Sequence, residues 1–414
     1  MSRRQAHAAR QWRDDYLGYL LSLPELNKIK LMYPPLRTRY KNGNDHSRNK
    51  VLDALRAVAI LLVLGRHADV SALWNRVGWC GVDLFFVLSG FLISGLLFQE
   101  YKRFGDIRLK TFWLRRGLKI YPAFYVCTLA QAFVYLLMFG KILGTKTVVH
   151  RFLIDATFLS SYFEGVSGHM WSLAVEEHFY FVLPLFLLFL MKLRGKKEDP
   201  FASIPAVFLL IAAGSLLLRM AAKPASYGDY YSYLLPTHLR MDGLFCGVMV
   251  GYLFHFKPQI LARVARWPLL VAGIMLLSPV YYLNIEYWHM YTWGLTCTFL
   301  GFACILVWAI HVPFRQDHFL ALPVNLLARI GFYSYSIYLW HWIIIFYLRP
   351  YFRLRCMKTG SPVAWSSAME SGQWLFCVVF SIIVGIGMAV VIEQPVLRLR
   401  DRWFPSRTRQ VNAV

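Results

Sequence analysis

The stretch RAVAILLVLGRH, residues 56–67, sets a run of apolar side chains between an arginine and an arginine–histidine pair. If it is helical, Arg56 and His67 lie eleven residues apart on one face, about 16 Å apart along the axis. Ionisable groups within a membrane helix face the bundle interior or a wet cavity more often than lipid. The stretch therefore predicts a membrane helix with a polar site along one face.

Apolar runs of similar length recur along almost the whole chain. The 414 residues are 57% hydrophobic and 16% charged, which is not the composition of a soluble globular domain. Runs of about 20 apolar residues predict membrane-spanning helices. We expect an all-α, polytopic integral membrane bundle of about ten transmembrane helices, at residues 53–72, 79–98, 121–139, 170–191, 203–222, 238–256, 268–284, 291–311, 329–348 and 373–393.

The net charge of +23 fits either nucleic-acid binding or basic cytoplasmic loops. If the N-terminus is cytoplasmic, most Lys and Arg residues fall in loops on that side, as at 108–119, 192–197 and 398–403. One outer loop, 349–358, is also basic. This distribution argues against a nucleic-acid partner and places both termini in the cytoplasm, with the lipid bilayer as the surroundings.

Three segments are expected. Residues 1–50 form a basic cytoplasmic arm without a signal-peptide core, residues 51–397 form the membrane domain, and residues 398–414 form a basic cytoplasmic tail. No motif has zinc-ligand spacing and none resembles a nucleotide-binding loop, so we expect no metal site.

Polar residues inside the first two predicted spans have structural and functional interpretations. Arg56 either reaches the cytoplasmic headgroups beside Asp53 or binds a ligand. His67 either makes a structural hydrogen bond or transfers protons. Asp83 is a partner for an Arg or His, or an interfacial residue. We expect the Ser89 hydroxyl to bond the carbonyl four residues earlier.

The segment HMWSLAVEEHFYF, residues 169–181, holds the densest polar cluster. Helical spacing places His169, Ser172, Glu176 and Tyr180 on one stripe, whereas Glu177 and His178 are expected to point elsewhere. Glu176 is either a site carboxylate or an interfacial, helix-capping residue.

Two later segments are also polar. Arg240 and Asp242 stand at the start of a span and form either a structural pair or part of a site, and the glycines that follow every four residues allow close helix packing. In YSYSIYLWHWIIIF, residues 333–346, we expect Ser336, Tyr338 and His341 to be hydrogen-bonded core groups.

Seven segments together resemble the acyltransferase-3 family of integral membrane acyltransferases over roughly residues 50–405. They are LDALRAVAILLVLGRH, GVDLFFVLSGFLI, FWLRRGLKIYP, WSLAVEEHFY, RMDGLFCG, YSYSIYLWHW and IEQP. The family's Arg and His correspond to Arg56 and His67, its Arg-rich loop with Tyr-Pro to Arg115, Arg116, Tyr121 and Pro122, and its Trp-Ser…Glu element to Trp171, Ser172 and Glu176. Arg66, beside His67, departs from the pattern.

The resemblance implies transfer of an acyl group, often acetyl, from cytoplasmic acyl-coenzyme A to a hydroxyl of a surface glycan or lipid-linked sugar. It implies a multi-pass protein of the bacterial cytoplasmic membrane, with acetyl-CoA or another acyl-CoA as donor substrate and no permanently bound cofactor. Some members carry a fused extracytoplasmic esterase-like domain; none is expected here.

The residues are compatible with this chemistry. Guanidinium groups suit the phosphates of coenzyme A, and its long pantetheine arm could run along a helix face from Arg56 toward His67. A neutral His67 would act as general base, with an acyl-His intermediate as an alternative. The expected site residues are His67, Arg56, Glu176 and Asp83 for catalysis, Arg115, Arg116, Lys119 and Tyr121 for acyl-CoA, and Trp171, Ser172, Arg240 and Asp242 for the acceptor.

An ion-coupled transporter or flippase is the alternative from another functional class. Buried His, Arg and carboxylate groups within many spans also describe carriers. No inverted repeat is visible in the sequence, and the basic loop at 108–119 has no evident role in transport. A carrier would move solute without consuming an acyl donor.

Overall fold

A computed structural model describes residues 49–195, 199–222, 229–312, 321–350 and 367–406, and these residues contain helices and connecting segments but no strand. The elements are α3 (Lys50–His67), α4 (Ala72–Val77), η1 (Gly78–Cys80), α5 (Gly81–Phe104), α6 (Leu109–Leu143), α7 (Thr145–Ala156), α8 (Met170–Arg194), α9 (Ile204–Ala221), α10 (Tyr230–Tyr233), η2 (Thr237–Leu239), α11 (Met241–Phe256), α12 (Pro258–Val264), α13 (Trp267–Leu276), α14 (Ser278–Tyr282), η3 (Met290–Gly294), α15 (Leu295–His311), α16 (Ala321–Phe332), α17 (Ser334–Trp342), η4 (Ile343–Leu348), α19 (Ser367–Met388), η5 (Ala389–Glu393) and α20 (Gln394–Trp403).

The helical class is confirmed, and every one of the ten predicted segments overlaps a helix. Within the described ranges, six helices are long and apolar enough to cross a membrane, or seven if the bent pair α11–α12 forms one span. This marks an integral membrane protein. Helix α3 is not among the six because its eighteen residues include Lys50, Asp53, Arg56 and Arg66. The count of ten crossings and the side of each terminus remain predictions.

The predicted terminal segments are only partly covered. Residues 1–48 of the basic arm, and most of the basic outer loop at 349–358, lie outside the described residues. Helix α3 begins where the arm was expected to end, because the Asn49 side chain caps it by accepting a hydrogen bond from the backbone of Val51 at 3.1 Å. The expected boundary at 397/398 falls within α20.

Glycines bring α5 and α11 into close contact, as their spacing in α11 predicted. A Cβ atom added at Gly247 would lie 2.2 Å from the carbonyl oxygen of Val87, and one added at Gly90 would lie 1.9 Å from that of Leu244. Neither space admits a side chain, so the two backbones can approach this closely only with glycine at both positions. Helix α5 is thereby fixed in the centre of the bundle.

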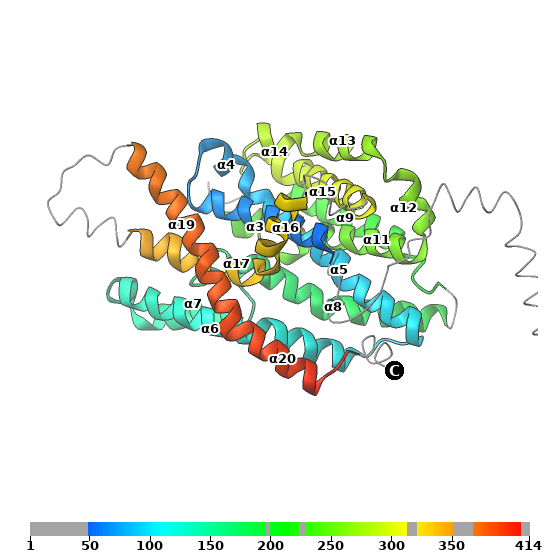
Figure 1. Cartoon of the computed structure of the whole chain (residues 1–414), viewed down its shortest axis with the longest axis horizontal. Helices are drawn as coiled ribbons and strands as arrows, with labels where there is room; N and C mark the ends of the chain where they lie inside the picture. The colour runs from blue at the N-terminus through cyan, green and yellow to red at the C-terminus, as the bar shows by residue number, and fades with distance from the viewer. Residues whose placement is uncertain (1–48, 196–198, 223–228, 313–320, 351–366, 407–414) are drawn as a thin grey trace, which may run out of the picture. The chain divides into compact units, whose positions relative to one another are not determined.

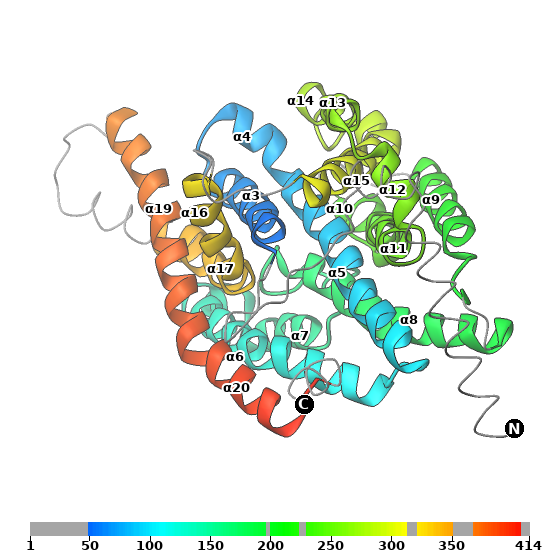
Figure 2. The same cartoon turned by 45° about the vertical axis from the view of Figure 1, so that its right-hand side comes forward.

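Helices α3 and α5 lie between two groups of helices (Figures 1 and 2). On one side α16 packs on α3 and α17 packs on α19; on the other side α11 packs on α5 and α13 packs on α15. Gly331 of α16 lies so close to α3 that an added Cβ would be 1.7 Å from the carbonyl oxygen of Asp53. Helices α3, α5, α6, α8 and α17 then line the cavities described below.

Candidate functional site

Three cavities follow one another through the helical unit and share lining residues. We call them the basic cavity, which includes Arg115, Arg116, Lys119 and Arg400; the central cavity, which includes Arg56, Ser89, Arg116, Lys119, Glu176 and Tyr338; and the histidine cavity, which includes Arg66, His67, Trp79, His169, Arg240 and Tyr338. Arg116 and Lys119 line both the basic and the central cavity. Val82 and Tyr338 line both the central and the histidine cavity. The three cavities therefore adjoin in a series, which we call the path.

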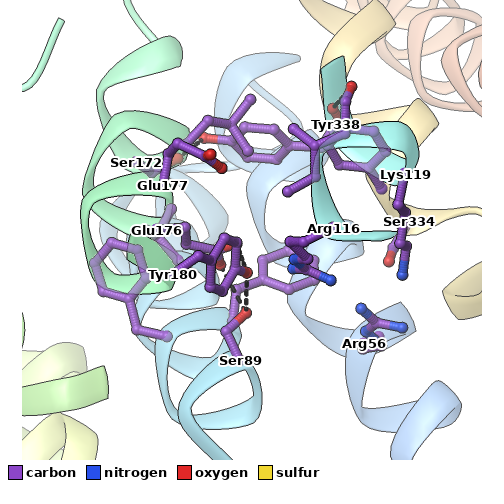
Figure 3. A pocket seen from close by; sticks show the side chains of 16 residues that line it. Arg56, Ser89, Arg116, Lys119, Ser172, Glu176, Glu177, Tyr180, Ser334 and Tyr338 are labelled. Carbon is purple, nitrogen blue, oxygen red and sulfur yellow. Dashed lines mark hydrogen bonds between the residues drawn. The ribbon is translucent and has the colours of Figure 1, made fainter. Parts of the chain in front are cut away.

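The central cavity places cations opposite carboxylates. Figure 3 shows Glu176 and Glu177 projecting from α8, with Arg116 between them and the side of the cavity that holds Arg56 and Lys119. The Arg116 guanidinium lies over the Tyr180 ring, 4.0 Å from its centroid, which is a cation–π contact. Arg56 also lies 3.8 Å from Asp53, its expected neighbour one turn earlier.

Glu176 is the centre of a hydrogen-bond network inside the central cavity. The Ser89 hydroxyl donates to its Oε1 at 2.8 Å, and the Tyr180 hydroxyl donates to its Oε2. The prediction that Ser89 bonds a carbonyl in its own helix is therefore wrong. Ser89 faces a carboxylate on a neighbouring helix, which is a stronger acceptor than a backbone carbonyl. A bond of the predicted kind, to the carbonyl four residues earlier, is made by Ser94, which donates to the Gly90 carbonyl at 2.7 Å.

Glu177 also lines the central cavity, although its sequence position suggested that it points elsewhere. It accepts a hydrogen bond from the Tyr121 hydroxyl of α6. Consecutive residues of a helix point about 100° apart, so both Glu176 and Glu177 can face a cavity lined by more than one neighbouring helix. Tyr121 itself does not line the central cavity. It lines a separate groove between α6 and α8, together with Pro122.

The basic cavity brings together three of the four residues predicted to bind acyl-CoA. Arg115, Arg116 and Lys119 line it, and Arg400 of α20 joins them from the far end of the sequence. Arg115 is held by an ion pair with Asp401 at 3.0 Å, which fixes α20 against α6. Tyr121 does not line this cavity.

His67 lines the histidine cavity and contacts His341 of α17, a fully buried residue that is not among those lining the cavity. His67 Nδ1 lies 2.9 Å from His341 Nε2, and His341 Nδ1 lies 2.6 Å from the carbonyl oxygen of Tyr338. A carbonyl only accepts, so His341 Nδ1 carries the proton and its Nε2 accepts from His67 Nδ1. In a neutral His67 this leaves Nε2 with the lone pair. His341 thus fixes the tautomer in which His67 can act as a base.

The boundary between the central and the histidine cavity is made of hydroxyl groups and a loop backbone. The Tyr338 hydroxyl donates to the carbonyl oxygen of His169 at 2.9 Å and lies 2.6 Å from the Ser172 hydroxyl. Ser172, which was predicted to bind the acceptor, lines the central cavity, and its hydroxyl is hydrogen-bonded to Tyr338. Trp171, the preceding residue, lines the histidine cavity and packs edge-on against Phe86.

The loop that contains His169 is anchored by Asp155, which lies at the end of α7. Its carboxylate accepts from the backbone nitrogens of Val166 at 2.8 Å and Ser167 at 3.3 Å. Gly165 is required beside it, because a Cβ there would lie 2.0 Å from a carboxylate oxygen. Burial raises the pKa of Asp155 to about 7, and the two backbone donors oppose this rise.

Two buried ion pairs join the helices around the histidine cavity. Arg240 pairs with Asp83 of α5 at 2.7 Å, and Asp242 pairs with Arg219 of α9 at 2.7 Å. Arg240 and Asp242 therefore bond different partners, and a pair between these two is not what forms. Arg219, which is fully buried, also donates to the carbonyl of Leu239 at 2.7 Å. Arg240 lies between η2 and α11, whereas Asp242 lies in the first turn of α11, so the two side chains reach different neighbouring helices.

The sequence matches a known protein family. The sequence model of the acyltransferase-3 family, described as an acyltransferase domain, matches residues 49–391. The chain belongs to the acyltransferase-3 family. The match spans α3 to η5, and so contains the central and histidine cavities of this acyltransferase-3 domain; α20, which supplies Arg400, follows it.

Several relatives come from Staphylococcus aureus. The O-acetyltransferase OatA of strain NCTC 8325 is 28% identical over 353 residues. The protein SACOL0978 of strain COL, which is assigned as an O-acetyltransferase by inference, is 31% identical over 346 residues. Each alignment covers 79% of this chain and 54% of the relative, so the chain spans about half the length of the curated relatives it matches. No solved structure matches significantly.

The acyltransferase-3 structure brings most predicted residues to the path but changes their partners. Arg56, Arg116, Lys119, Ser172 and Glu176 line the central cavity, whereas His67, Trp171 and Arg240 line the histidine cavity. Among the described residues, neither Glu176 nor Asp83 is hydrogen-bonded to His67. The prediction that His341 is a hydrogen-bonded core group is confirmed, but its contact with His67 was not predicted, and Arg400 and Arg219 were not singled out from the sequence. Only His341 and Arg219 had a signal, an ionisable side chain inside an apolar run.

Proposed function

We propose that this protein transfers an acyl group, acetyl in the first instance, from acyl-coenzyme A to a hydroxyl of a carbohydrate or lipid-linked glycan. The observation that carries the proposal is the path from the basic cavity to the histidine cavity, with cations at one end and a tautomer-fixed imidazole at the other. Membership of the acyltransferase-3 family and the O-acetyltransferase names of the relatives support it.

The proposed topology has ten membrane crossings, both termini in the cytoplasm, and the basic cavity at the cytoplasmic mouth of a bacterial inner membrane protein. The excess of Lys and Arg in the loops predicted to be cytoplasmic supports this orientation. In the proposed segments, residues 51–397 carry the activity, between a basic arm at 1–50 and a tail at 398–414.

The donor enters from the cytoplasm. Arg115, Arg116, Lys119 and Arg400 bind the phosphates of coenzyme A, because several cations converge there on one cavity. The pantetheine arm extends through the central cavity past Arg56 and brings the thioester to the boundary at Tyr338. Tyr121 supports this passage through Glu177 rather than by contact with phosphate.

The transfer step uses His67 as general base. Nε2 takes the proton of the acceptor hydroxyl while its oxygen attacks the thioester carbonyl carbon. The new C–O bond forms, the C–S bond breaks, and the thiolate of coenzyme A leaves and receives the proton from His67. His341 holds the Nδ1 proton of His67 throughout. Glu176 orders Ser89 and Tyr180 along the thioester path.

The test uses purified full-length protein in detergent with [14C]acetyl-CoA. Wild-type protein is expected to bind acetyl-CoA saturably, and Arg116→Ala to weaken that binding about tenfold or more, since a charge-assisted hydrogen bond contributes roughly 1.5–3 kcal/mol. His67→Ala is expected to bind acetyl-CoA normally but to lose acyl transfer by a factor of about 10² to 10⁴. His289→Ala, at an exposed histidine away from the cavities, is the control.

Two results would contradict the proposal. Folded wild-type protein that binds no acyl-CoA would favour the transporter class, which consumes no donor. Transfer that survives in His67→Ala would remove His67 from the chemistry. A labelled His67 recovered after acid quenching would identify the covalent acyl-His route instead of direct transfer.

A further inference from the structure

Unpaired polar atoms gather around the histidine cavity. Trp79 Nε1 and Glu286 Oε2 are buried without a hydrogen-bond partner among the described residues, and the ring of His169 has only the backbone of Leu339 near it as a polar partner. His169 is only 2% exposed. Leaving a buried donor or acceptor unpaired is unfavourable, because the group has lost its hydrogen bonds to water and gained none in return. Trp79 and His169 line the cavity directly, and Glu286 follows the lining residue Ile285. Such a cluster indicates a polar ligand.

Arg66 adds a cation to the same cavity. Its guanidinium donates to the carbonyl oxygen of Asn75 at 2.5 Å, and within the described part of the chain it has no carboxylate at ion-pair distance. Glu286 acts on Arg66 electrostatically from further away and is held by the Tyr230 hydroxyl. Arg240, the other cation of the cavity, is already paired with Asp83.

The mixture of charges selects the chemical class of the ligand. A simple anion would satisfy Arg66 and the Trp79 N–H but would be repelled by Glu286, and a cation would meet the opposite problem. A hydroxyl group both donates and accepts, so a molecule with several hydroxyls can bond Arg66, Trp79 and His169 together while Glu286 lies beside the cavity. This is the pattern presented by a sugar ring.

Size and shape agree with a sugar. The histidine cavity measures about 240 Å³, below the roughly 300–1,000 Å³ of pockets that hold drug-sized ligands. Trp79, Trp171 and Tyr230 contribute aromatic side chains to its wall. Flat aromatic faces with a polar edge cover the C–H face of a sugar while leaving its hydroxyls to the polar groups.

We propose that the histidine cavity is the acceptor site, and that it binds one sugar unit through Trp79, Arg66 and His169 with a hydroxyl presented to His67 Nε2. The assignment rests on the proposed acyl transfer and adds the residues that select the acceptor. His169, whose ring lies 5.0 Å from that of His341, positions the sugar next to the base. The donor and acceptor then meet at Tyr338 and Val82 from opposite cavities.

Two measurements on the full-length protein test this assignment. The first is calorimetric binding of short oligosaccharides of N-acetylglucosamine, glucose and galacturonic acid in the absence of donor. The second is acetyl transfer to whichever oligosaccharide binds, with the KM of sugar and of acetyl-CoA measured separately. The variants are Trp79→Phe, which keeps a ring but removes the N–H, and Arg66→Gln.

Trp74→Phe is the matched control, because the Trp74 N–H already donates to the carbonyl of Leu62 at 3.2 Å and Trp74 does not line the cavity. We expect Trp79→Phe and Arg66→Gln each to weaken sugar binding and raise the sugar KM about tenfold. The acetyl-CoA KM should stay unchanged in both variants, and Trp74→Phe should behave as wild type.

Three results would overturn the assignment. Sugar binding that is unchanged in both variants would leave the buried polar atoms to water. A rise in the acetyl-CoA KM would give this cavity to the donor. Wild-type protein that binds acetyl-CoA but none of the three sugars would exclude a sugar site. Failure of acetyl-CoA binding alone would contradict the proposed function, whereas sugar binding would still decide this assignment.

Discussion

At the scale of single residues, the His67–His341 contact is the most informative geometry in the site. It joins two imidazoles 274 positions apart in the sequence. Because His341 Nδ1 donates to the Tyr338 carbonyl, His341 Nε2 accepts from His67 Nδ1, and both tautomers are fixed. Replacing His341 with Gln removes the ring nitrogen that accepts the hydrogen bond from His67 Nδ1. His67 could then adopt the other tautomer, with its proton on the nitrogen that must act as base.

His341→Gln is therefore expected to lower kcat by about 10- to 100-fold, the size of loss seen when the partner that orients a metal-bound histidine is removed, with both KM values unchanged. Its pH–rate profile should also shift, since the partner of His67 is changed. His311→Gln is the control, because His311 likewise lies near a backbone carbonyl of its own helix, at 2.8 Å, but has no histidine neighbour in the structure as described. Parallel losses of kcat and of protein yield in His341→Gln would show a purely structural role.

Glu176 supports a second prediction at this scale. Its carboxylate accepts two hydrogen bonds, from the hydroxyls of Ser89 and Tyr180, whereas a glutamine offers one acceptor oxygen and an N–H₂ group that must face a hydroxyl. Glu176→Gln should reduce turnover by at least tenfold in the acetyl-transfer assay. Glu177→Gln, which alters a single contact with Tyr121, should have a smaller effect; equal losses would deny Glu176 its separate role.

At the scale of elements, the ion pair between α9 and α11 is a strong constraint on the bundle. Arg219 and Asp242 are both buried, and removing one partner leaves an uncompensated charge, which costs about 3–5 kcal/mol. Arg219→Leu should lower the Tm in detergent by several degrees. The double change Arg219→Leu with Asp242→Leu should recover part of that loss. A double variant less stable than Arg219→Leu would argue against this pairing.

Asp155, at the end of α7, makes a pH-dependent contribution to the stability of the fold. The folded pKa of Asp155 is about 7 against an ordinary value of 3.8, so the folded state holds this proton more tightly than the unfolded state. Its contribution is therefore fully present below about pH 4 and is lost as pH rises to about 7. The Tm of the wild-type protein should fall as the pH is raised from 4 to 8, and the Tm of Asp155→Asn should change less over the same range. Identical slopes would contradict this assignment.

At the scale of the whole molecule, the three cavities predict that donor and acceptor approach from opposite sides. In proteoliposomes of known orientation, acetyl-CoA should be consumed only when it is supplied to the side that exposes the basic cavity. A cysteine introduced at Lys110, beside that cavity's α6 residues, in a variant whose seven native cysteines are replaced by serine, reports orientation through labelling by a membrane-impermeant maleimide. Consumption from both sides would contradict a one-way path, and solute uptake without acetyl-CoA would favour the carrier class.

Much of the architecture follows from the sequence alone. Apolar runs of membrane length predict the helices because burying a backbone in lipid requires internal hydrogen bonding, and each of the ten predicted segments overlaps a helix. The spacing of Arg56 and His67 predicts one shared face. The Gly247 spacing predicts close packing with a neighbouring helix, although not which one.

The partners of the polar residues were decided only by the tertiary structure. Ser89 bonds Glu176 rather than its own helix, Arg240 bonds Asp83, and His67 bonds His341. Helix periodicity assigns a side chain to a face, but it does not state which helix covers that face. A buried polar group takes the best partner that packing brings within about 3 Å, and that choice depends on contacts between segments far apart in the chain.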